Sequence, residues 1–287
     1  MDQKGLSTRR PLAGEIRMHF ISYGERTIAY ELYRHVNSRI SANLPNDEGV
    51  PYYFLIATGG GYVEGEHYLQ NIILDDNTHA ILTTQTPNYI YKCEHNQTTL
   101  QQCFLEVGEN ALCEYYFDET IPYQHALFHQ LSEISLKDHA KLILTDGLTA
   151  GYEENDEPFS YDRIAIKTRI YRHKRLLLND FLLVDPRFDE MKSLGYFEGY
   201  TNFNSVTIID EDLDATKVES YRHILDELSS SSRYGLSLIE SEGMVLRVLG
   251  LSGDENHRVI EALIRAYRSS LNLTPLNLRK GPHSMNI

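Results

Sequence analysis

Short runs of β-branched and aromatic residues, separated by glycine, asparagine, aspartate and proline, dominate the first two-thirds of the chain. Such runs predict short strands joined by tight turns, and none of them keeps the roughly 3.6-residue period of an amphipathic helix. The predicted strands are Ile16 to Tyr23, Thr27 to His35, Tyr52 to Ala57, Tyr68 to Leu74, Ala80 to Thr84, Leu100 to Val107, Ala111 to Tyr116, Ala126 to Ile134, Ala140 to Leu144, Tyr161 to Tyr171 and Leu176 to Leu183. We expect stacked antiparallel sheets or a spiral of strands rather than alternating strand and helix units.

The hydrophobic pattern changes in the last third of the chain. Asp214 to Leu228 and Asp254 to Leu271 each place their apolar residues on one helical face, which predicts two amphipathic helices. Between them, Gly235 to Glu240 and Met244 to Gly250 predict a β-hairpin that turns at Ser241-Glu242-Gly243.

These patterns predict a single, mostly β domain over residues 1–287. Its β body spans about residues 15–211 and its helix-hairpin-helix unit about residues 212–273. The polar tail, residues 274–287, contains proline and glycine and is expected to be mobile when the protein is alone.

The charge of the chain excludes two classes of partner. Its 287 residues carry a formal net charge of −14, whereas binding to nucleic acid or to an anionic membrane draws on lysine and arginine. No run approaches the roughly 18 apolar residues of a spanning helix, and residues 1–10 lack the apolar core of a signal peptide. We therefore expect a cytoplasmic protein that binds neither nucleic acid nor membranes.

Cysteine and histidine give no metal site. The chain has three cysteines, Cys93, Cys103 and Cys113. Their number and spacing fit neither a disulfide framework nor an ordinary zinc site, so we expect reduced, buried side chains at similar places on successive strands. Among the twelve histidines, His125 and His129, like Cys93 and His95, would share one face of an extended strand. Neither pair has a complete ligand set.

Two charge runs are open to two interpretations. The acidic run comprises Glu153, Glu154, Asp156 and Glu157, and the basic run comprises Arg163, Lys167, Arg169, Arg172, Lys174 and Arg175. Solvated faces are the ordinary interpretation. The alternative is a stripe that steers a charged partner.

A glycine-rich loop follows the predicted strand Tyr52 to Ala57 and contains Gly59, Gly60, Gly61 and Gly65. It lacks the Gly-Lys-Ser/Thr ending of a phosphate loop and the spacing of a dinucleotide-binding turn. A tight corner of a sheet is the simplest interpretation. Because the chain also lacks a nucleophile elbow, we expect no enzymatic activity.

Several motifs resemble, in order and spacing, those of the UreD-type (UreD/UreH) urease accessory proteins. They are Ala57 to Glu66, Ile81 to Gln85, Tyr89 to Lys92, Leu112 to Pro122, Leu144 to Gly151 with Glu157 to Phe159, Gly235 to Ser237 and Val245 to Arg247. The resemblance extends from about Tyr52 to Arg279. The positions that depart from the family pattern are Thr58, Glu64, Gly65, Glu66, Tyr89 and Tyr152.

The resemblance implies a spiral of roughly perpendicular sheet layers and a role in urease maturation. Such proteins bind apo-urease and the accessory protein UreF, and through UreF the GTPase UreG, during nickel insertion. No tightly bound cofactor is implied; nickel is in transit along a water-filled path, and Glu66 and Asp146 are the residues expected to line it. The alternative is a nickel-storing or nickel-sensing protein that holds the metal at histidines.

Overall fold

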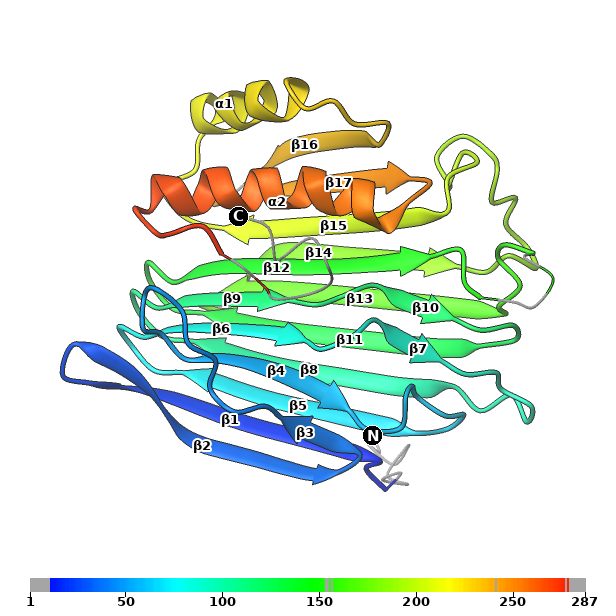
Figure 1. Ribbon diagram of the computed structural model, residues 1–287, viewed down its shortest axis with the longest axis horizontal. Helices are drawn as coiled ribbons and strands as arrows, with labels where there is room; N and C mark the ends of the chain where they lie inside the picture. Colours follow the sequence, from blue (N-terminus) through cyan, green and yellow to red (C-terminus); the bar gives the residue numbers. More distant parts are fainter. Residues whose placement is uncertain (1–10, 153–154, 156, 241, 277, 279–287) are drawn as a thin grey trace, which may run out of the picture.

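The computed structural model describes residues 11–152, 155, 157–240, 242–276 and 278. Within these ranges the chain forms two stacked β-sheets, and two helices lie on the outer face of one of them (Figure 1). The predicted mostly β fold with stacked layers and two C-terminal helices is confirmed.

The strand orders of the two sheets are as follows. The seven-stranded sheet runs β14 (Arg175–Val184), β13 (Arg163–Arg172), β11 (Leu127–Leu136), β8 (Thr99–Val107), β5 (His67–Leu74), β1 (Gly14–Tyr23) and β2 (Arg26–Val36). The ten-stranded sheet runs β16 (Arg233–Ile239), β17 (Gly243–Gly250), β15 (Asn202–Ile209), β12 (Lys141–Thr149), β9 (Leu112–Tyr116), β6 (His79–Thr84), β4 (Tyr52–Ala57) and β3 (Ser38–Ile40), with β10 (Thr120–Pro122) beside β12 and β7 (Asn88–Ile90) beside β10.

Through the middle of the body, successive long strands alternate between the two sheets, so the chain winds as a spiral. Neighbouring strands within each sheet therefore come from successive coils of the spiral. They pair in parallel, from β1 to β13 in one sheet and from β4 to β12 in the other. The prediction of antiparallel sheets is wrong for these strands. It holds only at the ends of the sheets, for example in the β1–β2, β13–β14 and β16–β17 pairs.

The error has a physical cause. Alternation of inward and outward side chains is the same in parallel and antiparallel strands, so the hydrophobic pattern cannot distinguish the two pairings. The strands of both layers also run along a common direction in Figure 1, rather than crossing at the roughly perpendicular angle that the resemblance implied.

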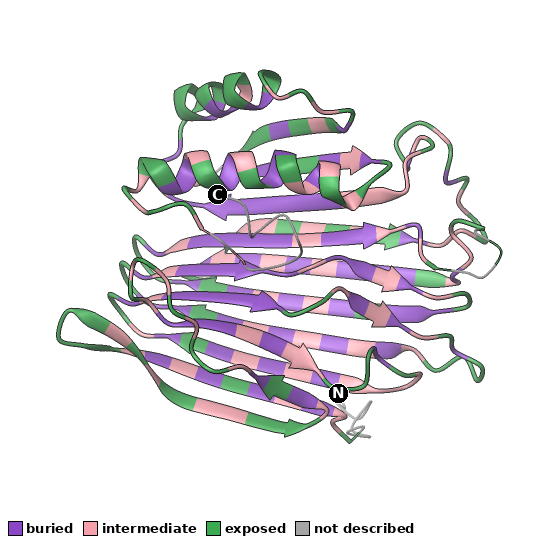
Figure 2. Cartoon of the chain, viewed as in Figure 1, coloured by how far each residue is buried: buried purple, intermediate pink, exposed green. Residues whose placement is uncertain are grey.

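The ten-stranded sheet separates two hydrophobic cores, and consecutive residues of one strand enter different cores. Leu142 of β12 lies in the core between the sheets, with Phe20 and Leu82. Its neighbour Ile143 lies in the core beneath the helices, with Val259. Strands between the two cores, such as β12, therefore carry runs of buried residues, whereas strands of the seven-stranded sheet, such as β8, alternate buried and less buried residues (Figure 2).

The helix-hairpin-helix unit is confirmed in type and order. Helix α1 spans Ala215–Asp226, α2 spans Gly253–Ser270, and β16 and β17 form the hairpin between them. The Asp214 side chain accepts a hydrogen bond of 2.8 Å from the backbone amide of Lys217, which caps the start of α1. No helix among the residues described is both long enough and apolar enough to span a membrane.

Four strands were not predicted: β3, β7, β10 and β15. The first three are only three residues long. Two backbone groups in the described part of the predicted tail form hydrogen bonds with the body. The Thr274 amide donates to Glu48 at 2.7 Å, and the Tyr52 hydroxyl donates to the Leu278 carbonyl at 2.8 Å. Tail residues 277 and 279–287 lie outside the described ranges.

Candidate functional site

A row of polar side chains crosses the otherwise hydrophobic space between the two sheets. We call this set the polar row: Gln70, Asn88, Gln101, Gln130, Asp146 and Asp180. It begins near the glycine-rich corner, where Gln70, Asn88 and Gln101 line a cavity of about 30 Å³. It ends at a second cavity of about 20 Å³, which Asp146 and Asp180 line from different sheets.

The strand register brings the members of the polar row together. Gln101 of β8 pairs with Gln130 of β11, so two glutamines from neighbouring coils point in the same direction. Each is 1% exposed. The Gln130 side-chain amide donates to Asp146 Oδ2 on the opposite sheet at 2.7 Å, so Gln130 lies between Gln101 of the first cavity and Asp146 of the second.

Asp146 lies on β12, two residues after the apolar run that ends at Leu144. Its Oδ1 accepts a hydrogen bond of 2.8 Å from the Gly147 amide. Burial raises the pKa of Asp146 to about 7; the negative charges of Asp180 and Glu119 add to this rise, and the bonds from Gly147 and Gln130 oppose it. Asp146 is therefore a carboxyl group that is partly ionised near neutral pH.

Glu66 occupies a different position, at the turn before β5. Its carboxylate accepts hydrogen bonds from the Val63 amide at 2.8 Å, the Tyr68 hydroxyl at 2.7 Å and the Asn37 side chain at 3.4 Å. Glu66 is not among the residues lining either cavity, whereas Tyr68 lines the first. The structure thus does not bring Glu66 and Asp146 together, and it gives Glu66 the contacts of a turn residue.

The comparisons with known proteins agree with this architecture. The family model described as UreD urease accessory protein matches residues 12–281. The chain belongs to the UreD family. Proteins named urease accessory protein UreD from Streptococcus thermophilus (strain CNRZ 1066) and Streptococcus salivarius (strain 57.I) are each 41% identical to it over 268 residues, which cover 93% of this chain and 96% of theirs. The relative of that name from Staphylococcus aureus (strain bovine RF122 / ET3-1) is 30% identical over 71% of this chain and 73% of its own.

The glycine loop of this UreD protein is a corner of the spiral. Gly60 and Gly65 adopt positive φ angles of 72° and 74°, which favour glycine. At Gly61 a Cβ atom would lie 2.7 Å from the carbonyl oxygen of Tyr89, on the next coil. Gly59 has no such close contact. The tight corner predicted from the sequence therefore requires glycine at three of the four positions.

Substitution of Gly61 by alanine tests this role. We expect the added methyl group to push the Tyr89 strand away and to lower the free energy of unfolding by about 1–3 kcal/mol, as overpacking does. Urea denaturation followed by circular dichroism measures the change. Gly235→Ala is the matched control, because no atom lies within 4 Å of its added Cβ. Equal stability of the two variants would contradict the prediction.

The cysteines are buried and free, as predicted. Cys103 and Cys113 lie on β8 and β9 in the core between the sheets, but Cys93 lies in a loop, so its predicted strand position is wrong. The predicted histidine pair is also wrong. His125 occupies a turn with a φ of 59°, and only His129 lies on a strand, β11. These histidines therefore share no strand face.

Sequence reasoning missed a buried ion cluster beneath α2. Arg268, which is 1% exposed, pairs with Glu114 and with Glu48. His79 Nε2 lies 2.6 Å from Glu114 Oε1. Glu48, His79 and Glu114 could together ligate a metal ion, but the guanidinium of Arg268 already pairs with both carboxylates. The cluster fastens α2 to the ten-stranded sheet. Its members are far apart in the sequence, so no local motif indicates it.

A second ion pair, between the half-exposed His257 and the buried Glu119, holds the start of α2. Burial raises the pKa of Glu119, but the hydrogen bond and charge of His257 outweigh it and lower that pKa to about 2. His257 Nε2 lies 2.5 Å from Glu119 Oε1, and the pKa of His257 is raised by this bond. Asn204 of β15 donates to the same oxygen at 2.7 Å. Glu119 lies close to Gly147 of β12, because a Cβ added at Gly147 would be 2.8 Å from Glu119 Cγ.

The family departure at Glu64 also has a local explanation. Its carboxylate accepts hydrogen bonds from the backbone amides of Glu94, His95 and Gln97 at 2.7 to 3.0 Å, and from the His95 ring at 3.1 Å. Partial burial raises its pKa, but the bonds from Gln97 and His95 lower it overall. Glu64 therefore holds the loop that follows β7 rather than facing a cavity.

Proposed function

We propose that this protein is a urease maturation chaperone that binds apo-urease and UreF, and through UreF the GTPase UreG, and that nickel passes along its polar row. Membership of the UreD family and the names of its relatives support the link to urease. The polar row carries the proposal for nickel, because a folded interior otherwise excludes such groups unless they are fully hydrogen-bonded.

Three buried polar atoms support a wet path through the body. Gln101 Nε2, Thr120 Oγ1 and Ser132 Oγ have no hydrogen-bond partner among the described residues. Gln101 belongs to the polar row, and Ser132 pairs in register with Thr168, which lines the second cavity. Unpaired polar atoms of this kind are satisfied by water or by a hydrated ion.

The chemistry of the row fits a dication in transit. Amide, hydroxyl and carboxylate oxygens bind a borderline cation more weakly than clustered histidines or thiolates do, so the ion can leave again. Asp146 contributes negative charge when a cation approaches, because a nearby positive charge lowers its pKa. It returns toward the protonated form when the cation leaves.

The storage or sensing alternative requires a set of strong ligands. In the described part of the chain, the group of three with ligating distances is Glu48, His79 and Glu114, and Arg268 pairs with both of its carboxylates. No specific observation therefore favours tight nickel binding at histidines over passage.

The test is activation of apo-urease by purified UreF, UreG, GTP and nickel, with and without this chain. We expect the chain to co-purify with UreF and apo-urease and to raise both urease activity and the nickel content of urease. Equal nickel occupancy without the chain would overturn the proposal. Gel filtration of the isolated chain after incubation with nickel distinguishes the storage alternative from passage. A storage protein would retain stoichiometric nickel through the column, whereas a protein that only passes nickel on would not.

A further inference from the structure

Four tyrosines from successive coils contact one another, edge-on or tilted, along one corner of the spiral. We call this set the tyrosine column: Tyr89, Tyr91, Tyr123 and Tyr152. The ring of Tyr123 is central. Its centroid lies 5.2 Å from that of Tyr91 and 5.1 Å from that of Tyr152, and it meets the Tyr89 ring edge-on at 6.3 Å.

Backbone pairing sets the spacing of the column. Tyr123 and Tyr152 form a parallel β-bridge, and the Tyr123 amide donates to the Ile90 carbonyl at 2.8 Å. Gly61 leaves room for Tyr89 and Tyr91, because a Cβ there would lie within about 3 Å of both side chains. The glycine corner and the tyrosines are thus parts of one arrangement.

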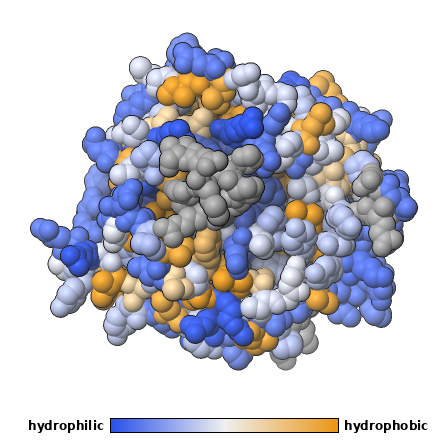
Figure 3. Space-filling view, viewed as in Figure 1, coloured by the Kyte–Doolittle hydropathy of each residue, from blue (hydrophilic) through white to orange (hydrophobic). Residues whose placement is uncertain are grey.

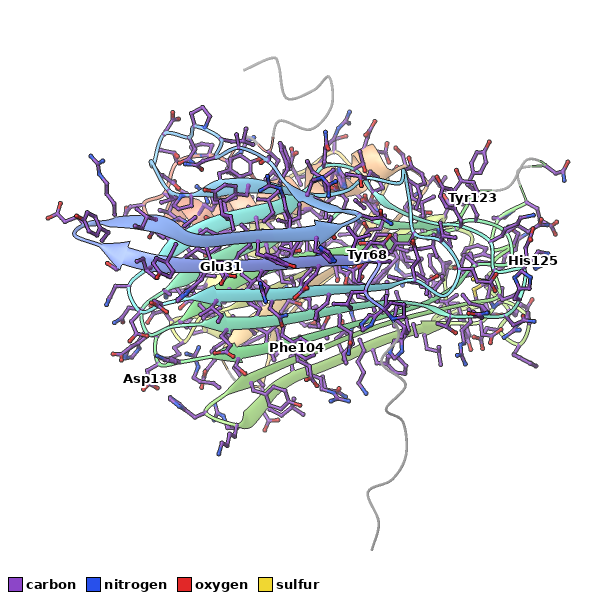
Figure 4. The ribbon with its side chains drawn as sticks, turned by 90° about the horizontal axis from the view of Figure 1, so that it is seen from below. Glu31, Tyr68, Phe104, Tyr123, His125 and Asp138 are labelled. Carbon is purple, nitrogen blue, oxygen red and sulfur yellow. The ribbon has the colours of Figure 1, made fainter. Side chains whose placement is uncertain are left out.

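The column is at the surface, although aromatic rings of this size are usually buried. Tyr152 is 53% exposed and the other three are partly exposed. Figure 4 shows the Tyr123 ring reaching outward at the end of the molecule that carries His125, opposite Asp138. On the face seen in Figure 3, by contrast, hydrophobic side chains lie in separate patches among polar ones.

The charge around the column favours a cationic partner. The protein has a formal net charge of −14. Lys92, which follows Tyr91, is neutralised by Glu94 at 2.6 Å. Glu64 adds a carboxylate to the loop that follows Tyr91, where it accepts hydrogen bonds from the amides of Glu94 and His95. Negative potential attracts cations to this surface, and tyrosine ring faces bind them, arginine best because its planar group also stacks.

We propose that the tyrosine column is a docking site for an arginine-bearing segment of a protein partner. Clustered aromatic rings supply large contact areas that lose little conformational freedom on binding, and their hydroxyls can pair with the backbone of an extended segment. Neither Tyr123 nor Tyr152 belongs to the polar row, so the proposal gives these two residues a separate role.

The test is fluorescence anisotropy of the full chain with a labelled peptide of arginine-glycine repeats. Two matching peptides separate the contributions of planarity and charge. The lysine-glycine peptide keeps the charge without the planar group, and the citrulline-glycine peptide keeps the planar group without the charge. We expect the arginine peptide to bind tightest, and Tyr123→Ser/Tyr152→Ser to weaken it at least about tenfold. The control is Tyr23→Ser/Tyr30→Ser on the β1–β2 hairpin, where both tyrosines are 72% exposed; its affinity should stay within about twofold.

Single substitutions at the most exposed member keep the test independent of folding. Tyr152→Phe retains a ring face and should bind the arginine peptide like the natural protein, whereas Tyr152→Leu should bind it several-fold more weakly. Equal binding of the arginine and lysine peptides, unaffected by substitutions in the column, would show attraction by net charge alone and overturn the proposal. Because the assay contains no urease or accessory protein, its result is independent of the maturation role.

Discussion

Replacing Asp146 with asparagine is expected to stabilise the protein at alkaline pH and, at the same time, to slow nickel delivery to urease. The pKa of Asp146 is about 7 in the folded protein and about 3.9 in an unfolded chain. A raised folded-state pKa means that folding favours the protonated form. Below about pH 4 both states are protonated and the substitution has little effect on stability through this group.

The effect grows as pH rises through the window between these two values. The unfolded chain then releases its proton more readily than the folded protein, so the natural protein loses stability until about pH 7 and the asparagine variant does not. We expect the variant to be about 1–3 kcal/mol more stable at about pH 8, after allowance for partial solvent access to the site. Urea denaturation at about pH 5 and about pH 8 measures the difference.

A second buried aspartate supplies the matched control. Asp210 is 2% exposed, but it pairs with Lys141 and accepts a hydrogen bond from the Tyr267 hydroxyl at 2.8 Å. Asp210→Asn should therefore destabilise the protein, because it removes the more buried of the two carboxylates that pair with Lys141, the other being Asp212. If Asp146→Asn destabilises the protein at about pH 8 as Asp210→Asn does, the buried-carboxyl interpretation of Asp146 is wrong.

The functional part of this prediction uses the activation assay. Asp146→Asn should lower the initial rate of urease activation several-fold while binding of UreF stays normal, because the row loses its ionisable group but not its shape. Asp138→Asn, which removes an exposed carboxylate that is not part of the polar row, should not change the rate. Replacing Glu66 and Asp146 together with alanine should in addition destabilise the glycine-rich corner, because Glu66 accepts hydrogen bonds from the Val63 amide and the Tyr68 hydroxyl. Normal activation by Asp146→Asn with normal nickel occupancy would contradict the path.

The second large effect is expected at Arg268. Replacing it with alanine should lower the free energy of unfolding by about 3–5 kcal/mol, because Glu114, which is fully buried, would lose its cationic partner. Glu48 and the attachment of Thr274 should be disturbed as well, since Arg268 and the Thr274 amide share Glu48 Oε1. Urea denaturation measures the loss.

Arg265 is the control for this prediction, because it lies on the same helix one turn earlier and is exposed. Arg265→Ala should change stability by less than about 0.5 kcal/mol. The double variant Arg268→Met/Glu114→Gln should recover part of the loss, since it removes both buried charges together. A loss at Arg268 no larger than that at Arg265 would contradict the assignment.

Much of the local structure could be predicted from the sequence, because its causes are local. The alternating pattern predicted the long strands of the body except β15, and the helical pattern predicted α1 and α2 within a few residues. Turn chemistry indicated the glycine corner, where the positive φ angles of Gly60 and Gly65 depend on a few neighbouring residues. Family motifs near these elements were recognisable for the same reason.

The tertiary structure alone decided which strands pair, and with them the site. Winding of the chain placed Gln101 beside Gln130 and Gln130 opposite Asp146. It also separated Glu66 from Asp146, and it joined Arg268 to Glu114 across 154 positions of sequence. An alternating pattern states which side chains face inward but not which strand lies beside them, and hydrogen bonds and pKa shifts depend on those neighbours.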